Sequence, residues 1–380
     1  MDSIVNNAVA SGTSEKEQKE GEENKRTSDD EELLSLLEEH KARIKVVGIG
    51  GGGNNTLDRV SEIGVEGAQT IAINTDAQDL IDTKADRKIL IGKEITRGLG
   101  AGSVPKVGED SAKESEREVA DTFKNSDMIF ITCGMGGGTG TGAAPYVAQI
   151  AKKTGALVVG VVTVPFTMEG SRRYENAMLG IEKMEAHVDT LIVIPNEKLL
   201  EVAPNLPLHT AFKLADEVLT NAVKGITELV TRSGLINLDF ADIRTVMTDA
   251  GMAMIGLGES DSENGAEEAV ERALNNPLLD VDLNGAAGAL VNVTGGPDMA
   301  LDDAKKVVSK ISETLDDDAK IIWGAQVMED LNKVIKTMVV ITGVKSDQIR
   351  GKKRLEDEKR KVDNELGLEF ISGGNKEKEQ

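Results

Sequence analysis

The sequence predicts an α/β fold: a doubly wound, mostly parallel sheet, a long central helix and a second, smaller α/β domain. Three observations predict it. Short apolar runs alternate with helix-like segments, as in parallel sheets whose strands are joined by helices. A long amphipathic stretch, residues 208–231, follows the first set of apolar runs. Glycine-rich turns come directly after two of those runs, where a parallel sheet presents its carboxyl edge.

Each apolar run predicts a strand. The expected strands are Ile44–Val47, Thr70–Asn74, Lys88–Ile91, Met128–Thr132, Leu157–Thr163, Leu191–Pro195, Ala289–Thr294, Lys320–Gln326 and Thr337–Thr342. The central helix is expected over Leu208–Thr231 and ends before Gly234, a common residue beyond a helix C-terminus.

Composition changes divide the chain into five parts. Residues 1–40 carry 12 acidic and 4 basic side chains and predict a largely disordered acidic extension. Residues 346–380 carry 9 of each and predict a flexible tail with a short apolar motif near its end. Between them we expect a ligand-binding domain at 41–207, the central helix at 208–233 and a C-terminal α/β domain at 234–345.

The charge limits which partners the chain can bind. The formal net charge is −22, of which the part between the two tails carries −14. Such a body repels nucleic acid and anionic membranes. If it binds a polyphosphate, backbone amides and a divalent metal must hold it. The sequence shows no signal-peptide pattern and no apolar run near 18 residues, so we expect a soluble, cytoplasmic protein.

The single cysteine, Cys133, excludes a disulfide within the chain and any cysteine-based zinc site. It lies at the end of an expected strand, between Thr132 and Gly134. We therefore expect a buried, unreactive thiol.

Two glycine runs predict a phosphate site. Gly48–Asn55 follows the first expected strand, and Gly134–Gly142 follows the fourth, ahead of a helix expected to begin near Ala143. Glycines let the backbone approach a ligand, and helix N-termini present free N–H groups to an anion. Thr139 and Thr141 add hydroxyl donors.

The first run also permits another function. Gly48, Gly50 and Gly53 fit the dinucleotide-binding fingerprint, and Asp76 lies where a ribose-binding acid would. A Rossmann-type NAD-binding oxidoreductase is therefore an alternative. The second, longer glycine run counts against it, since that fold has no use for one.

The motifs together resemble the FtsZ branch of the tubulin/FtsZ family of GTPases over about residues 42–345. The run Gly136–Gly142 carries the family signature, and Gly234–Asp242 resembles the family's catalytic loop. The acidic extension and the ending at Leu368–Ile371 are similar to archaeal members. The resemblance implies a GTPase, activated by polymerisation, whose head-to-tail filaments form the mid-cell division ring.

The resemblance also implies the residues that bind GTP. They are Gly50, Gly51, Gly52, Gly53, Asn54, Asn55, Asn74, Asp76, Gly100, Ala101, Gly102, Gly136, Gly137, Gly138, Thr139, Gly140, Thr141, Gly142, Pro165, Glu169, Arg173, Asn196, Phe212 and Asp216. Phe212 and Asp216 lie four apart on the central helix and share one face, so a ring can stack on a base while a carboxylate accepts from guanine N–H groups. Glu169 and Arg173 are expected to reach the ribose and phosphates.

The residues for hydrolysis lie elsewhere. Neither glycine run supplies a carboxylate, and the candidates Asn237, Asp239 and Asp242 follow the far end of a helix roughly 36 Å long. One chain cannot complete its own site, and the resemblance implies that these residues act on the GTP of the neighbouring subunit. It also implies Mg²⁺ bound mainly through the phosphates, with no metal site of the protein's own.

Partners follow from the same resemblance. The chain is expected to bind itself, and to reach the membrane only indirectly, through an anchor protein similar to SepF that binds the motif of Leu368, Phe370 and Ile371. The sequence leaves two further alternatives open. One is a filament of the tubulin superfamily with a role in cell shape, and the other is a regulator that binds GTP without hydrolysing it.

Overall fold

The computed structural model describes residues 42–65, 67–202, 207–232, 234–236, 238–279, 286–316, 318–329 and 331–344. The acidic extension, the tail with Leu368, Phe370 and Ile371, and the candidate Asn237 lie outside the described residues. The description below concerns the unit that begins at Ala42.

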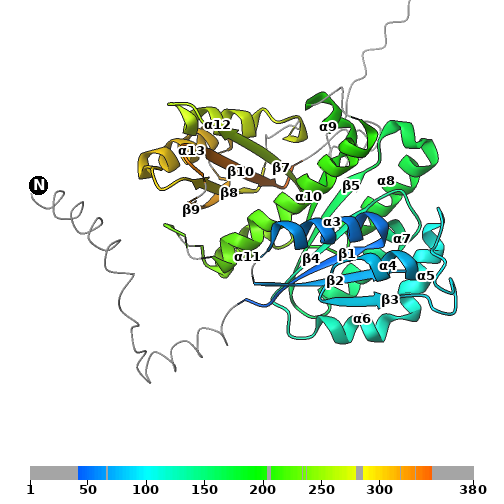
Figure 1. Cartoon of the computed structure of the whole chain (residues 1–380). Helices are drawn as coiled ribbons and strands as arrows, with labels where there is room; N and C mark the ends of the chain where they lie inside the picture. The colour runs from blue at the N-terminus through cyan, green and yellow to red at the C-terminus, as the bar shows by residue number, and fades with distance from the viewer. Residues whose placement is uncertain are drawn as a thin grey trace, which may run out of the picture. The chain divides into compact units, whose positions relative to one another are not determined.

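The strands of the described chain form one ten-stranded sheet (Figure 1), in the order β3-β2-β1-β4-β5-β6-β7-β10-β8-β9. Their bounds are Ile44–Ile49 (β1), Ala68–Asn74 (β2), Arg87–Leu90 (β3), Met128–Gly134 (β4), Leu157–Val164 (β5), Thr190–Pro195 (β6), Gly251–Ser260 (β7), Gly288–Gly295 (β8), Lys320–Val327 (β9) and Ile335–Thr342 (β10). All neighbours from β3 to β7 are parallel, β10 is antiparallel to both β7 and β8, and β8 is parallel to β9. The predicted fold class is confirmed.

The sequence analysis missed one strand, β7. The two glycines in its interior, Gly256 and Gly258, resemble strand breakers in sequence. In the structure they are contact points: a Cβ on Gly256 would lie 2.2 Å from the Ala273 carbonyl oxygen, and one on Gly258 would lie 2.1 Å from that of Ala269. Both carbonyls belong to the helix that packs on this strand, so the glycines allow close packing there.

Helices cover both faces of the sheet. Their bounds are Gly50–Ile63 (α3), Ala77–Asp82 (α4), Pro105–Glu114 (α5), Glu116–Phe123 (α6), Thr139–Lys152 (α7), Ser171–Glu185 (α8), Asn196–Val202 (α9), Leu208–Thr231 (α10), Phe240–Met247 (α11), Gly265–Leu274 (α12) and Leu301–Thr314 (α13). The central helix α10 has the predicted bounds.

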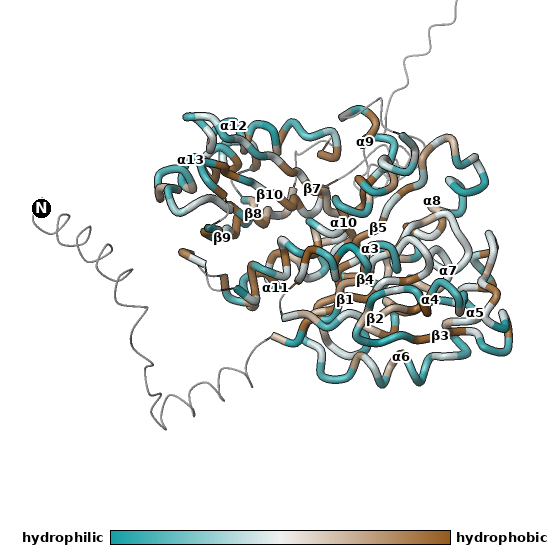
Figure 2. Tube along the Cα trace, viewed as in Figure 1, coloured by the Kyte–Doolittle hydropathy of each residue, from teal (hydrophilic) through white to brown (hydrophobic). Residues whose placement is uncertain are grey.

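Two clusters of buried side chains show which helix packs on which face. Leu57 of α3, Ile226 of α10 and Ile243 of α11 pack with strand residues on one face. Val147 of α7 and Val307 of α13 belong to the cluster on the other face, together with side chains of α5, α6, α8 and α12. Figure 2 shows the result, with hydrophobic residues along the strands and hydrophilic residues on the outer sides of helices such as α4 and α6.

The predicted domain boundaries are neither supported nor opposed by the sheet. β6 and β7 are joined by three residue pairs, Thr190 with Gly251, Leu191 with Met252 and Ile192 with Ala253. The sheet therefore continues from the predicted ligand-binding domain into the predicted C-terminal domain, and α10 packs against strands of both. The division at residues 207 and 233 stays a prediction.

Cys133 lies in β4 and is fully buried, as expected. Burial raises the pKa of its thiol to about 12, so the thiolate is not formed at neutral pH. None of the described helices combines the length and the apolar character needed to cross a membrane.

Close contact between α5 and α7 fixes the helix that begins within the second glycine run. A Cβ on Gly142 of α7 would lie 1.8 Å from the Pro105 carbonyl oxygen, and one on Gly108 of α5 would lie 2.3 Å from the Gly138 carbonyl oxygen. Backbone therefore lies directly against backbone on both sides of this contact. The position of α7 depends on these two glycines.

Replacing Gly142 by alanine should destabilise the protein by about 1–3 kcal/mol, because the added methyl group has no space. Helix propensity alone predicts the opposite sign, a gain of about 1 kcal/mol. Gly137→Ala is the matched control, since a Cβ there meets no atom within 4 Å. Urea unfolding of both variants measures the difference. Equal stability of Gly142→Ala and the parent would contradict the packing role.

Candidate functional site

A cavity of about 370 Å³ opens at the carboxyl edge of the parallel strands. Ile49 ends β1, Gly134 ends β4 and Thr163 lies near the end of β5, and all three line it. The strand order reverses its direction between β1 and β4, and such a switch point is where open α/β sheets bind ligands. The topology alone therefore favours a ligand site here.

Two helices begin at this cavity, and both begin inside glycine runs that the sequence analysis read as turns or loops. The first run is not a loop, because α3 already begins at Gly50. The second run ends inside α7, which begins at Thr139 and not near Ala143. The prediction was wrong because a glycine-rich segment was taken for a loop. Glycine has a low helix propensity, but packing against neighbouring backbone holds these turns helical.

The first turns of α3 and α7 offer a set of backbone donors. The first N–H groups of a helix have no partner inside it, and neither α3 nor α7 has a side chain that caps its N-terminus. Within the described chain, the N–H groups of Gly51, Gly52, Thr139 and Gly140 donate to no acceptor. With the positive ends of two helix dipoles, they form a site for an anion.

Glycines at the start of α3 allow this close approach. Gly50 has φ +69°, and a Cβ on it would lie 3.0 Å from the Gly140 nitrogen and 3.2 Å from the Thr139 Cβ. A Cβ on Gly52 would lie 3.0 Å from the Gly134 nitrogen. At Gly50 the start of α3 is thus in van der Waals contact with the start of α7, and a side chain there would push the two helices apart. Gly52 instead lies against the end of β4.

The two threonines of the second run have different roles. Thr139 lines the cavity, and its Oγ1 lies 2.6 Å from the Oγ1 of Thr75. Thr141 is buried and does not line it; its hydroxyl accepts a hydrogen bond of 2.8 Å from the Gly136 N–H. The hydroxyl of Thr141 therefore holds the turn in shape, and of the two threonines only Thr139 belongs to the cavity lining.

The opposite wall of the cavity carries the side chains predicted for base recognition. Phe212 and Asp216 of α10 and Asn196 at the start of α9 all line it. The Phe212 ring packs edge-on against Phe166, with centroids 5.2 Å apart, and stays partly exposed. Asn196 is 5% exposed and its Oδ1 has no hydrogen-bond partner, although buried acceptors are normally paired. That oxygen suits a ligand N–H donor.

Asp216 is the carboxylate of this wall. Burial raises the pKa of its carboxyl group to about 6 from an ordinary value of 3.8. An ionised but poorly solvated carboxylate is a strong acceptor for ligand N–H groups. Such a shift in a cleft is a common mark of a functional residue.

Glu169 and Arg173 form the third wall, as an ion pair of 2.6 Å between Glu169 Oε2 and Arg173 Nη1. The other carboxylate oxygen of Glu169 accepts from the Phe166 N–H at 2.9 Å. The guanidinium remains about half exposed, so it can still contact a ligand. Within the pair, Glu169 fixes the local turn and Arg173 supplies the available charge.

Of the 24 residues predicted to bind GTP, fifteen line the cavity and nine do not. They are Gly50, Gly51, Gly52, Asn55, Gly102, Gly137, Gly138, Thr139, Gly140, Pro165, Glu169, Arg173, Asn196, Phe212 and Asp216. Nine predicted residues do not line it. They are Gly53, Asn54, Asn74, Asp76, Gly100, Ala101, Gly136, Thr141 and Gly142.

Several of these nine hold the surrounding backbone. The Asp76 carboxylate caps α4 by accepting from the N–H groups of Gln78 and Asp79. Asn54 and Asn74 both donate to Asp79 Oδ2, at 3.0 and 2.6 Å. Sequence reasoning missed five lining residues, Ile49, Gly134, Met135, Thr163 and Ala215. Their strand-end or helix-face positions were the available signal.

The predicted catalytic acids lie at the other end of α10. Asp239 precedes α11 and Asp242 lies in its first turn, after the C-terminal end of α10 (Figure 1). Both are exposed, and neither has an ion pair or side-chain hydrogen bond with a described residue. Neither lines the cavity. Since α10 has 24 residues, its length is about 36 Å.

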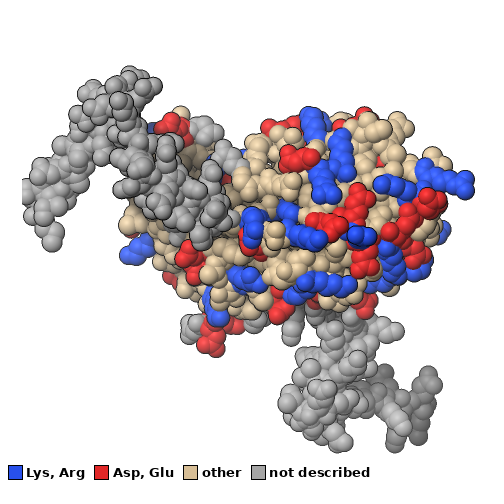
Figure 3. All heavy atoms as spheres, turned by 90° about the horizontal axis from the view of Figure 1, so that it is seen from below, with Lys and Arg blue, Asp and Glu red and all other residues tan. Residues whose placement is uncertain are grey.

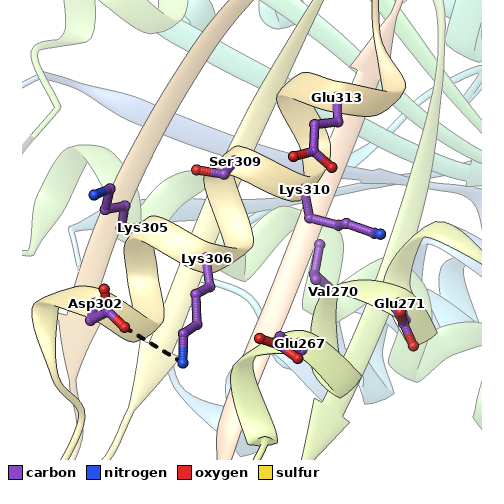
Figure 4. A pocket seen from close by; sticks show the side chains of 9 residues that line it. All are labelled: Glu267, Val270, Glu271, Asp302, Lys305, Lys306, Ser309, Lys310 and Glu313. Atoms are coloured by element: carbon purple, nitrogen blue, oxygen red, sulfur yellow. Dashed lines mark ion pairs between the residues drawn. The ribbon is translucent and has the colours of Figure 1, made fainter.

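A second hollow, of about 300 Å³, lies between α12 and α13 (Figure 4). Charged side chains of the two helices dominate its lining, and Lys306 and Asp302 pair within it at 3.5 Å. It lacks the glycines and free helix N-termini of the first cavity. On the face seen in Figure 3, basic and acidic side chains are interspersed, which does not suit nucleic acid.

Comparison with known proteins agrees with this geometry. The model "Tubulin/FtsZ family, GTPase domain" matches residues 43–204, and "FtsZ family, C-terminal domain" matches residues 251–345. Cell division protein FtsZ 1 of Methanocaldococcus jannaschii is 61% identical over 318 residues, 84% of this chain and 87% of that protein. The chain belongs to the FtsZ family.

Further FtsZ relatives extend the match. FtsZ of Methanothermobacter thermautotrophicus is 52% identical over 379 residues, 97% of this chain and 99% of that protein. A solved empty FtsZ dimer from M. jannaschii has a TM-score of 0.80 and 59% identity, covering 86% of this chain and 94% of that one. CetZ2 from Haloferax volcanii, at 18% identity and a TM-score of 0.71, shares the fold. The resemblance to FtsZ drawn from the motifs is confirmed.

Asp216→Asn should stabilise the protein at pH 7.5 by up to about 2–3 kcal/mol. Because its pKa is raised in the folded state, the parent loses stability as pH rises from about 4 to 6 and keeps that penalty above pH 6. The gain should vanish near pH 4. Urea unfolding at both pH values measures it, with Asp82→Asn, an exposed carboxylate of α4, as the control. A gain independent of pH would contradict the burial of this charge.

Proposed function

We propose that this chain binds and hydrolyses GTP and polymerises head-to-tail into the filaments of the division ring, in the cytoplasm at mid-cell. One observation carries the proposal: the cavity and the acids Asp239 and Asp242 lie at opposite ends of α10. A site divided in this way is completed by a second copy. Contacts of this head-to-tail kind do not close on themselves and extend into filaments.

The cavity suits guanine at its α10 wall. The ionised Asp216 accepts from the N1–H and the 2-amino group, and Phe212 stacks on the base. Adenine presents a different edge, which leaves a buried carboxylate unpaired and therefore costs binding energy. The free Oδ1 of Asn196 is a further acceptor for the base edge.

The phosphates are assigned to the N-termini of α3 and α7. Their free N–H groups and the Thr139 hydroxyl replace the lysine of other phosphate-binding loops. Among the described residues, no group of three or more His, Cys, Asp or Glu side chains is placed to hold a metal. We therefore propose that Mg²⁺, when present, is held mainly by the phosphates and offsets their charge during hydrolysis.

The oxidoreductase alternative loses its main support. The strand order β3-β2-β1-β4-β5-β6 is that of dinucleotide-binding folds. The acid required for the ribose, Asp76, instead caps α4 and does not line the cavity. GTP binding without NADH binding, measured by fluorescence titration, is the outcome that our proposal expects.

GTP turnover and light scattering, measured against protein concentration, test the proposal directly. Both should rise above one shared threshold, because a single subunit lacks half of the site. Turnover proportional to concentration, with no threshold and no scattering, would show that one chain is sufficient and would refute the shared site.

Asp239→Ala should retain GTP binding and lose turnover by at least about 100-fold, giving long-lived polymer. Asp216→Ala should have the complementary defect, weak GTP binding with intact acids. Each variant should be inactive alone, but a mixture of the two should recover part of the GTPase activity. In mixed filaments, a subunit of Asp216→Ala supplies its intact acids to the GTP bound by a neighbouring subunit of Asp239→Ala. No recovery, or parental turnover by Asp239→Ala alone, would refute the mechanism.

A further inference from the structure

Thr75 was not predicted as a site residue, and it does not line the cavity. It follows β2 and is fully buried. Its hydroxyl has one partner within the described chain, the Thr139 hydroxyl at 2.6 Å. Its neighbour Thr139 belongs to the first turn of α7 and does line the cavity.

The direction of this hydrogen bond follows from counting protons. A threonine hydroxyl has one proton to donate and can accept two. If Thr139 donated to Thr75, the buried proton of Thr75 would have no acceptor, at a cost of about 1–3 kcal/mol. The favourable arrangement has Thr75 donating and Thr139 accepting. The proton of Thr139 is then left for the cavity.

The backbone of Thr75 is held on both sides, so its hydroxyl cannot easily turn away. Its N–H donates to Asn74 Oδ1 at 2.8 Å. Its carbonyl oxygen accepts from the Thr96 hydroxyl and from the Gly100 N–H, both at 3.1 Å. The same stretch of chain ends at Gly102, which lines the cavity and accepts from the Gly138 N–H at 2.9 Å.

We propose that Thr75 is a positioning residue that makes the Thr139 hydroxyl a fixed donor aimed at a ligand phosphate. This inference rests on the proposed binding of GTP in the cavity. A donor prepared in this way favours an anionic oxygen, since hydrogen bonds to charged groups are the stronger ones. Thr75 thus acts through Thr139 and without touching the ligand.

Thr75→Val removes the proton and keeps the shape of the side chain. We expect it to weaken GTP and GDP binding roughly three- to tenfold, while guanosine, which has no phosphate, binds within about twofold of the parent. Thr75→Ser, which keeps the hydroxyl, should restore GTP binding. Thr83→Val, which removes another buried hydroxyl bond (to the Asp79 carbonyl oxygen at 2.8 Å), should leave all three affinities unchanged.

A double-mutant cycle separates a role through Thr139 from a general effect on folding. In a Thr139→Val background, Thr75→Val should cause no further loss of GTP affinity. Equal losses for guanosine and GTP, or an undiminished loss in that background, would overturn the inference. If Thr75→Val does not fold, Thr75→Ala and Thr75→Ser carry the same comparison.

The two levels of the proposal fail differently. If the parent does not bind GTP more tightly than guanosine, the proposed function is wrong. If the parent prefers GTP and Thr75→Val keeps the full preference, the function stands and only the role of Thr75 is refuted. Calorimetric titration of the full chain with GTP, GDP and guanosine supplies every value needed.

Discussion

The contact between the N-termini of α3 and α7 is the constraint on which the site depends. Peptide N–H groups from two helices converge on one cavity because Gly50 has no side chain to separate the start of α3 from the start of α7, and Gly52 lies close against Gly134 at the end of β4. The contact of α5 with Gly142 fixes α7 one turn beyond its start. The strands β1 and β4 bring both helix starts to the switch point of the sheet. A chain of strongly negative charge thereby gains a place for an anion without a cluster of lysines.

The chemistry on the opposite wall has a cost in stability. Asp216 is partly removed from water, and its raised pKa measures how poorly its charge is solvated. Asn196 keeps a buried oxygen unpaired. Both features are unfavourable in the free protein and become favourable when a ligand supplies N–H donors. Functional sites often concentrate such unfavourable groups, because a fully satisfied site has nothing left to offer a ligand.

Much of the fold followed from local patterns. Strand positions and the bounds of α10 followed from apolar periodicity and from Gly234 beyond the C-terminal end of the helix. Failures came where packing outweighs propensity. The strand β7 was missed because Gly256 and Gly258 resemble strand breakers. For the same reason the first glycine run was taken for a loop although α3 begins in it, and the start of α7 was predicted too late. Motifs led to most lining residues. They could not separate Thr139 from Thr141, since which of the two residues lines the cavity depends on the turn at Gly136.

The separation of the two ends of α10 has a consequence for mixtures of intact and defective chains. If the site is divided as proposed, a chain defective near Asp239 prevents hydrolysis of the GTP bound by its neighbour. A chain defective near Asp216 loses only the GTP site of its own. Chains with the first kind of defect still bind GTP and enter every polymer, but they cannot support hydrolysis at the neighbouring site. The effect of this defect should therefore be dominant in a cell that also makes the intact chain, whereas the second kind should behave as recessive.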